Sequence, residues 1–444
     1  MTFVSTLVGK FWNRRGQEEF DASKLPGKIF GLARKVWDLE AHRRHGPIRS
    51  VRPNDGICGS DSSGFRRITN RNPSSDRTEY CLILLAIQAF EVQILRCRYA
   101  AGERRPVNME AELQESPQAV TRQASALQAP LAELLRCIRQ HPPAFVLTCA
   151  RGTSAHSATF GKHLIERHLG IPVSAFAPNV TTIYKQRLKL NGQLFVTVSQ
   201  SGRSDDLIES TAMAKAAGAL TATIVNDADS PLARSSDIVL PMSAGPELSV
   251  AATKSFVTSL SAWLHVVAGW AALHELRASM ERLADRLAAA MGLDWGMALK
   301  VLCEARSLVS IGRGPTLAIA REAALKLKET CNLHAEAFSG AEFLHGPIAL
   351  VESSYPILLF VPTDEAAAGL RFLAADLCRK NASVFMADCV PQYAGCLPTL
   401  TPDHPDTDAV CLIQTFYGLV IRVAQCRGTN VDLPRHLQKI TRTR

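Results

Sequence analysis

A loop rich in hydroxyl groups follows an apolar stretch near the middle of the chain. Residues 194–198 are apolar and largely β-branched, which predicts a strand covered on both faces. Residues 207–217 have helical character, and the acidic pair 205–206 suits a first helical turn. The turn between them is Ser199-Gln200-Ser201-Gly202-Arg203-Ser204. Free N–H groups at a helix start, hydroxyls and one glycine suit an anion, most simply a phosphate monoester, although a serine-rich cap that binds only water stays an alternative.

A second group of chemically active residues lies further along the chain. Residues 318–331 predict a helix on which Glu322, Lys326 and Glu329 are spaced i, i+4, i+7 and so share one face. A solvated face with a Glu–Lys pair is the simpler interpretation. Alanine and leucine dominate the rest of the helix, so a charged stripe between buried neighbours favours acid–base chemistry. Further titratable residues follow at once: His334, Glu336, Glu342 and, in a His-Gly-Pro turn, His345.

Alternating strands and helices must position these residues. In the first half, strands are expected at 144–150, 194–199, 219–225 and 236–242, with a turn at 151–156 and a helix at 157–169. This βαβ order predicts an α/β fold with a parallel, doubly wound sheet of the flavodoxin type.

The strand pattern then repeats at a fixed offset. Arg151-Gly152 and Arg313-Gly314 are 162 positions apart, and each pair follows an apolar strand. The same offset relates other strand ends, namely Ser201 to Thr363 and residues 219–227 to 381–389. Three matches at one offset predict a tandem duplication of the α/β domain. The second copy has Val-Pro-Thr-Asp-Glu in place of the serine loop, so we expect only the first copy to bind an anion.

Composition narrows the class of protein. The net charge is +9 over 444 residues, but residues 1–108 carry +8 of it and the remainder only +1, which argues against nucleic-acid binding by the main body. Twelve scattered cysteines without a C-x-x-C pair predict reduced thiols in a cytoplasmic protein, with no disulfide framework or zinc site. We expect no secretory signal and no membrane span, since the nearest apolar stretch, residues 81–95, is short and interrupted by polar residues.

Residues 1–108 differ in character from the rest. They are rich in arginine and lack a sustained apolar pattern. Composition favours a disordered extension, or a gene-model artefact with Met109 as the true start, over a basic nucleic-acid arm. We therefore expect four segments: the extension at 1–108, a first domain at 109–290, a second at 291–430 and a tail at 431–444.

The motifs taken together resemble those of the tandem sugar isomerase (SIS) domain family. The resemblance rests on SQSG-x-[ST] at 199–204, ALKLKE at 324–329, HAEAF…E-x-x-HGP at 334–347, VAATKSF at 250–256 and the tail at 432–444. It covers about residues 109–444. Within that family the motifs resemble the isomerase half of glucosamine-6-phosphate synthase, and even more its stand-alone relative, the SIS-type glucosamine-6-phosphate deaminase.

The resemblance implies roles for particular residues. Phosphate would be held by Ser154, Ser199, Gln200, Ser201 and Ser204. Thr153 and the backbone near Val250 would contact the sugar. Glu329 would move a proton between C1 and C2, with Lys326 and Glu322 nearby.

Two further residues would complete the site. The resemblance implies that His345 helps to open the sugar ring from a neighbouring subunit, and hence a homodimer. Lys439 would close over the open-chain sugar and can form a Schiff base. A carboxylate that acts on two carbons, a histidine near neutral pH and a mobile lysine suit aldose–ketose chemistry, and we expect neither a metal nor a cofactor.

The expected reaction follows from the differences between this sequence and glucosamine-6-phosphate synthase. The synthase begins with a glutaminase domain whose nucleophile is the cysteine after the initiator Met, whereas this chain begins Met1-Thr2, so we expect no glutamine hydrolysis. That favours deamination of glucosamine 6-phosphate to fructose 6-phosphate and ammonia. Ser204 replaces a threonine of the synthase, Ala252 a small hydroxyl residue and Leu344 a lysine, which leaves the exact sugar open. A related isomerase or aminotransferase on another sugar phosphate and a sugar-phosphate-sensing regulator stay as alternatives.

Overall fold

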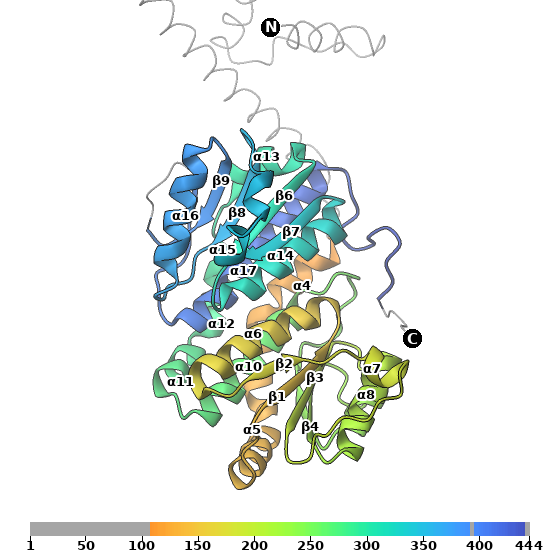
Figure 1. Ribbon diagram of the computed structural model, residues 1–444. Coiled ribbons are helices and arrows are strands. Elements are labelled where there is room, and N and C mark those ends of the chain that lie inside the picture. The colour runs from red at the N-terminus through yellow and green to blue at the C-terminus, as the bar shows by residue number, and fades with distance from the viewer. Residues whose placement is uncertain (1–106, 391–394, 440–444) are drawn as a thin grey trace, which may run out of the picture. The chain divides into compact units, whose positions relative to one another are not determined.

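The computed structural model describes residues 107–390 and 395–439, which form two α/β halves of the same design (Figure 1). The predicted N-terminal extension lies outside the described residues, apart from its last two positions.

The first half is built on a five-stranded parallel sheet, as the sequence predicts. Its strands are β1 (Val146–Ala150), β2 (Val173–Ala175), β3 (Leu194–Ser199), β4 (Leu220–Val225) and β5 (Ile238–Pro241). They lie in the order β2-β1-β3-β4-β5. Every residue of β3 is buried, which agrees with a strand covered on both faces.

The second half repeats this sheet. Its strands are β6 (Ser307–Gly312), β7 (His334–Ser339), β8 (Pro356–Phe360), β9 (Ser383–Ala387) and β10 (Cys396–Leu397). The order β10-β9-β8-β6-β7 is the same relative to the chain, and all neighbours are parallel. Ala150 and Gly312 end equivalent strands 162 positions apart, as do Val225 and Ala387. The predicted duplication is therefore confirmed.

Helices surround and join the two sheets. They are α4 (Asn108–Gln114), α5 (Ser116–Gln140), α6 (Gly152–Leu169), α7 (Asn179–Thr182), α8 (Asp205–Ala216), α9 (Pro231–Ser235), α10 (Lys254–Trp270), α11 (His274–Glu281), α12 (Leu283–Ala290), α13 (Leu299–Glu304), α14 (Thr316–Cys331), α15 (Gly340–Phe343), α16 (Ala367–Arg379) and α17 (Pro405–Cys426). Single 3₁₀ turns occupy Gly296–Ala298 and Pro347–Leu350.

One large apolar core lies between the two sheets. Helices α5, α6 and α10 cover the inner face of the first sheet, and α14 and α17 cover the inner face of the second. Smaller clusters under α8 and under α16 fill the outer faces. Helices α6 and α14, which are equivalent in the two copies, pack directly against each other. Residues on these two helices can therefore share one site.

The start of α6 corrects one prediction. The sequence analysis placed a turn at 151–156 because of its glycine and hydroxyls, but the helix begins at Gly152. Arg151 is the extended residue before it, and Gly152 takes a φ of 51°. Hydroxyl residues suit a first helical turn, whose N–H groups have no partner within the helix.

Helix α17 is the apolar segment that the sequence analysis overlooked. By length and composition it passes as a membrane span, the one such helix among residues 107–390 and 395–439. Most of it is buried, however, and it packs on α10, α12 and α14 between the two sheets. Burial on all sides gives a core helix the same composition as a spanning one.

His265 on α10 makes unfolding depend on pH. Burial lowers its pKa to about 4. Below about pH 6.5, His265 therefore binds a proton in the unfolded state but stays neutral in the folded state. The free energy of unfolding falls as pH decreases from 6.5 towards 4. We expect His265→Gln to recover about 1.5 kcal/mol of the loss between pH 7 and pH 5 in urea unfolding. Exposed His274→Gln on α11 is the control, and an equal pH dependence in both variants would refute the assignment.

Candidate active site

The predicted anion loop lies at the point where the strand order of the first sheet reverses, between β1 and β3. Strands β1 and β3 are neighbours, and the chain leaves them towards opposite faces, through α6 and α8. Ligands of doubly wound sheets bind at the carboxyl ends of the two strands at such a point. Thr153 and Ser154 in the first turn of α6 and the loop 199–204 before α8 therefore meet at one edge.

The loop itself has a fixed shape. Gly202 has a φ of 64°, and its N–H donates to the buried Ser199 Oγ at 3.0 Å. Arg203 extends away from the loop to pair with Asp227 at 2.8 Å. Ser204 precedes α8 with an extended backbone, and no hydrogen bond from its side chain caps that helix. The loop thus presents hydroxyls before a helix N-terminus, which suits a phosphate. The first turn of that helix also carries Asp205 and the buried Asp206, and Asp206 pairs with Arg151 at 2.8 Å.

Gly202 has no room for a side chain in the loop. A Cβ there would lie 2.1 Å from Ser230 Oγ, and positive φ adds strain. We expect Gly202→Ala to weaken fructose 6-phosphate binding at least tenfold, measured by calorimetry. Gly192→Ala is a matched control, because Gly192 has a φ of 73° but open space around it. If both variants bind equally well, the loop does not hold the phosphate.

The charged face of α14 is buried, contrary to its simpler interpretation as a solvated stripe. Lys326 is fully buried, and its Nζ lies 2.5 Å from Glu329 Oε2, 3.2 Å from Glu322 Oε1 and 3.0 Å from Thr153 Oγ1. These three acceptors match the three protons of an ammonium group. Glu329 remains 20% exposed while Glu322 is fully buried. Glu329 is therefore the carboxylate of this group that a ligand can reach.

Glu322 is the centre of a hydrogen-bond network that joins the two halves. Its Oε1 accepts from Thr153 Oγ1 at 3.2 Å and from the Tyr417 hydroxyl at 3.3 Å. Its Oε2 lies 2.8 Å from His156 Nδ1. Thr153 and His156 come from α6, and Tyr417 comes from α17. The packing of these helices places the charged residues of α14 beside Thr153 and His156 in the first turns of α6.

Neighbouring charges set the protonation states in this network. Burial disfavours the charged form of Glu322, but Lys326 and His156 outweigh burial and lower the pKa of this carboxyl. Burial likewise opposes the Lys326 ammonium, and the two glutamates reverse that effect and raise its pKa. Burial, with the charges of Glu322, Glu247 and Glu329, raises the pKa of Tyr417 well above its usual value. A charged Glu322–Lys326 pair and a neutral Tyr417 result.

Lys439 lies against a further buried carboxylate. Its Nζ is 3.1 Å from Glu247 Oε2 and 2.6 Å from the Ser249 carbonyl oxygen. Glu247 also accepts from the N–H groups of Thr253 and Ser255, so its orientation is fixed. The Ser255 hydroxyl donates to the same Glu247 oxygen at 2.7 Å, so the tail lysine is held at the segment before α10.

The segment around Val250 is tied to the same tail. The Val250 N–H donates to the Asp432 carbonyl oxygen at 3.1 Å, and Ser249 Oγ donates to the Asp432 carboxylate at 3.0 Å. That carboxylate also accepts from the Met109 N–H at 2.9 Å. The N–H of Val250 therefore already has a hydrogen-bond acceptor within the protein.

His345 is not brought to this group within one chain. It follows α15, is exposed, and precedes Gly346, whose φ is 140°. The adjoining Leu344 is 53% exposed. His334 and Glu336 also face outward, on the edge strand β7.

Sequence reasoning missed three members of the site: His156, Glu247 and Tyr417. A helix starting at Gly152 would have placed Thr153 and His156 on one face at i, i+3, so a correct helix start was the missing signal for His156. No local pattern marks Glu247 or Tyr417, whose partners lie 192 and 95 positions away.

The equivalent crevice of the second half is closed. The offset of 162 relates Glu329 to Arg167, and Arg167 on α6 pairs with Asp364 at 3.1 Å and with buried Asp406 at 3.4 Å. Beside them, Thr363 Oγ1 donates to Asp408 at 2.7 Å. The anion position of the second copy is thus occupied by the protein's own carboxylates, as expected from the loss of the serine loop.

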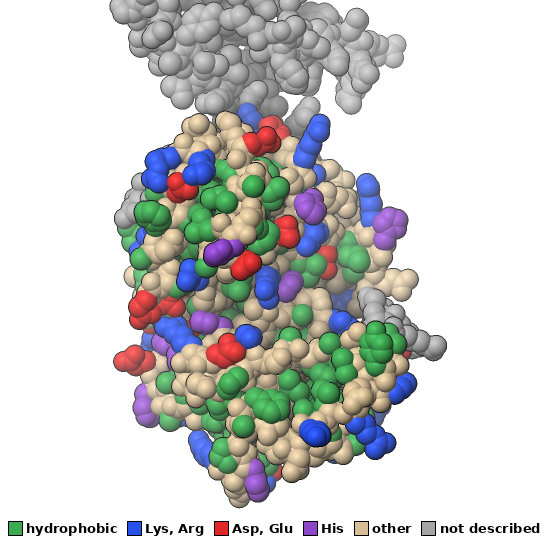
Figure 2. Space-filling view, viewed as in Figure 1, with side chains coloured by type: hydrophobic (Ala, Val, Ile, Leu, Met, Phe, Trp, Pro, Cys, Tyr) green, Lys and Arg blue, Asp and Glu red, His purple; other side chains and the backbone are tan. Residues whose placement is uncertain are grey.

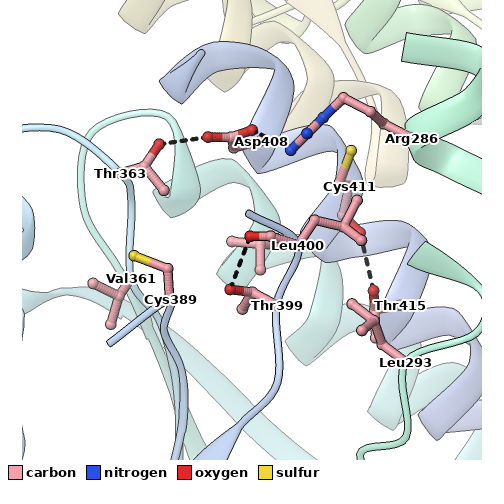
Figure 3. A pocket seen from close by; sticks show the side chains of 11 residues that line it. Arg286, Leu293, Val361, Thr363, Cys389, Thr399, Leu400, Asp408, Cys411 and Thr415 are labelled. Atoms are coloured by element: carbon pink, nitrogen blue, oxygen red, sulfur yellow. Dashed lines mark hydrogen bonds and ion pairs between the residues drawn. The ribbon is translucent and has the colours of Figure 1, made fainter. Parts of the chain in front are cut away.

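A small cavity remains at that crevice (Figure 3). It has a volume of about 20 Å³, room for about one water molecule. Thr363, Asp408 and Arg286 lie along one side, and Arg286 pairs with Asp408 at 2.7 Å. No sugar phosphate fits there. In the described part of the chain no group of His, Cys, Asp and Glu is placed to hold a metal ion.

Comparisons with known proteins agree with this architecture. The SIS domain model matches residues 145–268 and 301–386. The glutamine–fructose-6-phosphate aminotransferase (isomerizing) of Caulobacter vibrioides is 33% identical over 314 residues, which cover 65% of this chain and 50% of that protein. The chain thus spans about half the length of the curated relatives it matches.

Two solved structures are similar over the whole of their own chains. One, from Silicibacter pomeroyi and provisionally assigned as a phosphosugar isomerase, is 41% identical, covers 74% of this chain and has a TM-score of 0.70. The other is the C-terminal domain of glucosamine-fructose-6-phosphate aminotransferase from Francisella tularensis, 27% identical, with 75% of this chain covered and a TM-score of 0.68.

The fold and the site define a duplicated α/β protein with one serine-rich loop and one Glu–Lys–Glu group, formed by Glu322, Lys326 and Glu329. The chain belongs to the SIS domain family. Its relatives are sugar-phosphate isomerases and aminotransferases, and the family resemblance inferred from the motifs is confirmed.

Proposed function

We propose that this protein is an amino-sugar phosphate deaminase that converts glucosamine 6-phosphate and water to fructose 6-phosphate and ammonia. The observation that carries the proposal is the contact between partly exposed Glu329 and buried Lys326, 2.5 Å apart, beside the turn of α6 that adjoins the anion loop. A base positioned near a phosphate site suits proton transfer in a sugar phosphate.

The proton transfer uses one carboxylate for two carbons. In the open-chain sugar, Glu329 takes the proton from C2 and returns it to C1, while the C1 oxygen gains a proton and the amino nitrogen loses one. The product is an imine at C2. Water adds to that imine, the C–N bond breaks, and ammonia leaves with fructose 6-phosphate. Lys326 holds Glu329 in place, and the phosphate loop supplies the binding energy that fixes the sugar.

Lys439 acts on the carbonyl in this proposal. Its amine, held by Glu247, either stabilises the developing oxyanion or condenses with the carbonyl carbon. His345 assists ring opening in the site of a second copy. Its exposure, next to exposed Leu344 and Leu350, supports a subunit contact at this turn and hence a homodimer.

The test is a coupled assay of the full-length chain with glucosamine 6-phosphate and no glutamine. Release of ammonia together with an equal amount of fructose 6-phosphate supports the deaminase. Aldose–ketose conversion of another sugar phosphate without ammonia would favour the related isomerase, for which the departures at Ala252 and Leu344 are the argument.

A sugar-phosphate sensor that binds nucleic acid has less support. Figure 2 shows acidic and basic side chains interspersed on the face drawn, without a uniform basic surface. A sensor also needs only the phosphate loop, whereas Glu329, Lys326 and Lys439 are all present. Salt-dependent DNA binding by a chain that turns over no sugar phosphate would reverse this preference.

A further inference from the structure

We propose that His156 is a positioning residue for the proton transfer. It donates its Nδ1–H to Glu322 and thereby holds Lys326 in the geometry that orients Glu329. The proposal rests on the proposed function for its kinetic consequence, but the donor role of His156 is a property of the protein that can be tested without turnover.

The two oxygens of Glu322 have unequal partners. Oε1 has three within hydrogen-bond distance: Thr153 Oγ1, the Tyr417 hydroxyl and Lys326 Nζ, at 3.2, 3.3 and 3.2 Å. Among the described residues, Oε2 has one, His156 Nδ1 at 2.8 Å. Glu322 is fully buried, so water does not replace a lost donor there. An ionised carboxylate oxygen without a donor in such a place is costly.

A series of hydrogen bonds connects Glu322 to Glu329 through Lys326. Lys326 donates to Thr153 Oγ1, and the Thr153 hydroxyl donates in turn to Glu322 Oε1. The third proton of Lys326 goes to Glu329 Oε2. If His156 does not donate a hydrogen bond, the free energy of the Glu322 side chain is lowered when it takes up a proton or rotates towards other donors. Either change weakens the contact between Glu322 and Lys326, so Lys326 no longer holds Glu329 in the same orientation.

His156 has no other evident task in the core. Its side chain is 19% exposed, and within residues 107–390 and 395–439 the contact of its Nδ1 with Glu322 is the hydrogen bond that orients the ring. The residue lies on α6, the helix that contributes Thr153, so the same helix face supplies two donors to one carboxylate. Such a contact orients a catalytic group without touching substrate.

The kinetic test compares two substitutions of nearly equal size. His156→Asn retains an N–H donor near the Nδ1 position, and His156→Leu does not. We expect kcat to fall about 100-fold in the leucine variant and to recover to within about tenfold of wild type in the asparagine variant. KM should change less than threefold in both, since the phosphate loop is untouched. The exposed pair His274→Asn and His274→Leu controls for loss of a histidine.

A second measurement does not depend on activity or on the folding of the leucine variant. Nitrogen-15 NMR of the full-length wild-type chain should show a proton on His156 Nδ1, with the signal assigned by its loss in His156→Asn. Free neutral histidine favours a proton on Nε2, so a bare Nδ1 would overturn the proposal, as would equal kcat losses in the two variants. If wild type releases no ammonia while Nδ1 carries the proton, the proposed function fails and the donor role of His156 stands.

Discussion

Replacing Glu329 by glutamine should lower kcat for ammonia release about a thousandfold, with little change in affinity for the sugar phosphate. Glutamine retains the shape of the side chain but cannot take a proton, and general-base catalysis of this kind contributes about 10²- to 10⁴-fold. Since Glu329 is partly exposed and lies at the end of the Lys326 contact, the fold tolerates the change. Steady-state kinetics and calorimetric binding of fructose 6-phosphate measure the two effects separately.

The exposed Glu275 on α11 gives the matched control, because Glu275→Gln makes the same change of charge away from the site. Exchange of the C2 proton with deuterated solvent should disappear together with turnover in Glu329→Gln. Retention of that exchange would mean that another group carries the proton.

Replacing Lys326 by methionine should have the largest effect on stability. Methionine approximates the length of the lysine side chain but leaves Glu322 buried without its cation, and breaking a buried ion pair costs about 3–5 kcal/mol. We expect the free energy of unfolding at pH 7 to fall by about that amount in urea titration. Lys328→Met, two residues further along the same helix and exposed, should change stability by less than about 0.5 kcal/mol.

The difference between Lys326→Met and wild type should shrink as pH falls. In wild type the pKa of Glu322 is lowered, so its charge stabilises the fold above the unfolded pKa and this contribution is lost in acid. In the variant, His156 alone opposes burial, so the pKa of Glu322 is higher than in wild type and protonation relieves the penalty. A difference that stays constant down to pH 4 would mean that packing, and not charge, accounts for the loss.

The two halves show how a duplicated domain acquires one site and one closed crevice. The positions of Glu329 and Arg167 are equivalent, and each side chain reaches from one half towards the crevice of the other. In the first crevice the serine loop carries no acidic residue at the position of Asp364. In the second, Asp364 and Asp406 receive Arg167, and the crevice becomes a contact between the halves.

The sequence by itself determined the parts whose signals are local. Strand β3, the loop with Gly202, the charged face of α14 and the offset of 162 all follow from side-chain periodicity and turn chemistry, which neighbouring residues set. These features suffice to predict the α/β class, the duplication and the shared helix face of Glu322, Lys326 and Glu329.

The tertiary structure decided which of these residues meet, and which others join them. His156 lies 166 positions from Glu322, and Lys439 lies 192 from Glu247, so no pattern along the chain links them. Their contacts exist because α6 packs on α14 and the tail returns to the segment before α10. The start of α6 at Gly152 turned a predicted loop into a helix face, and burial turned a plausible surface ion pair into a buried acid–base group. Hydrogen bonds between distant segments depend on the shared core, which forms only when both halves are folded together.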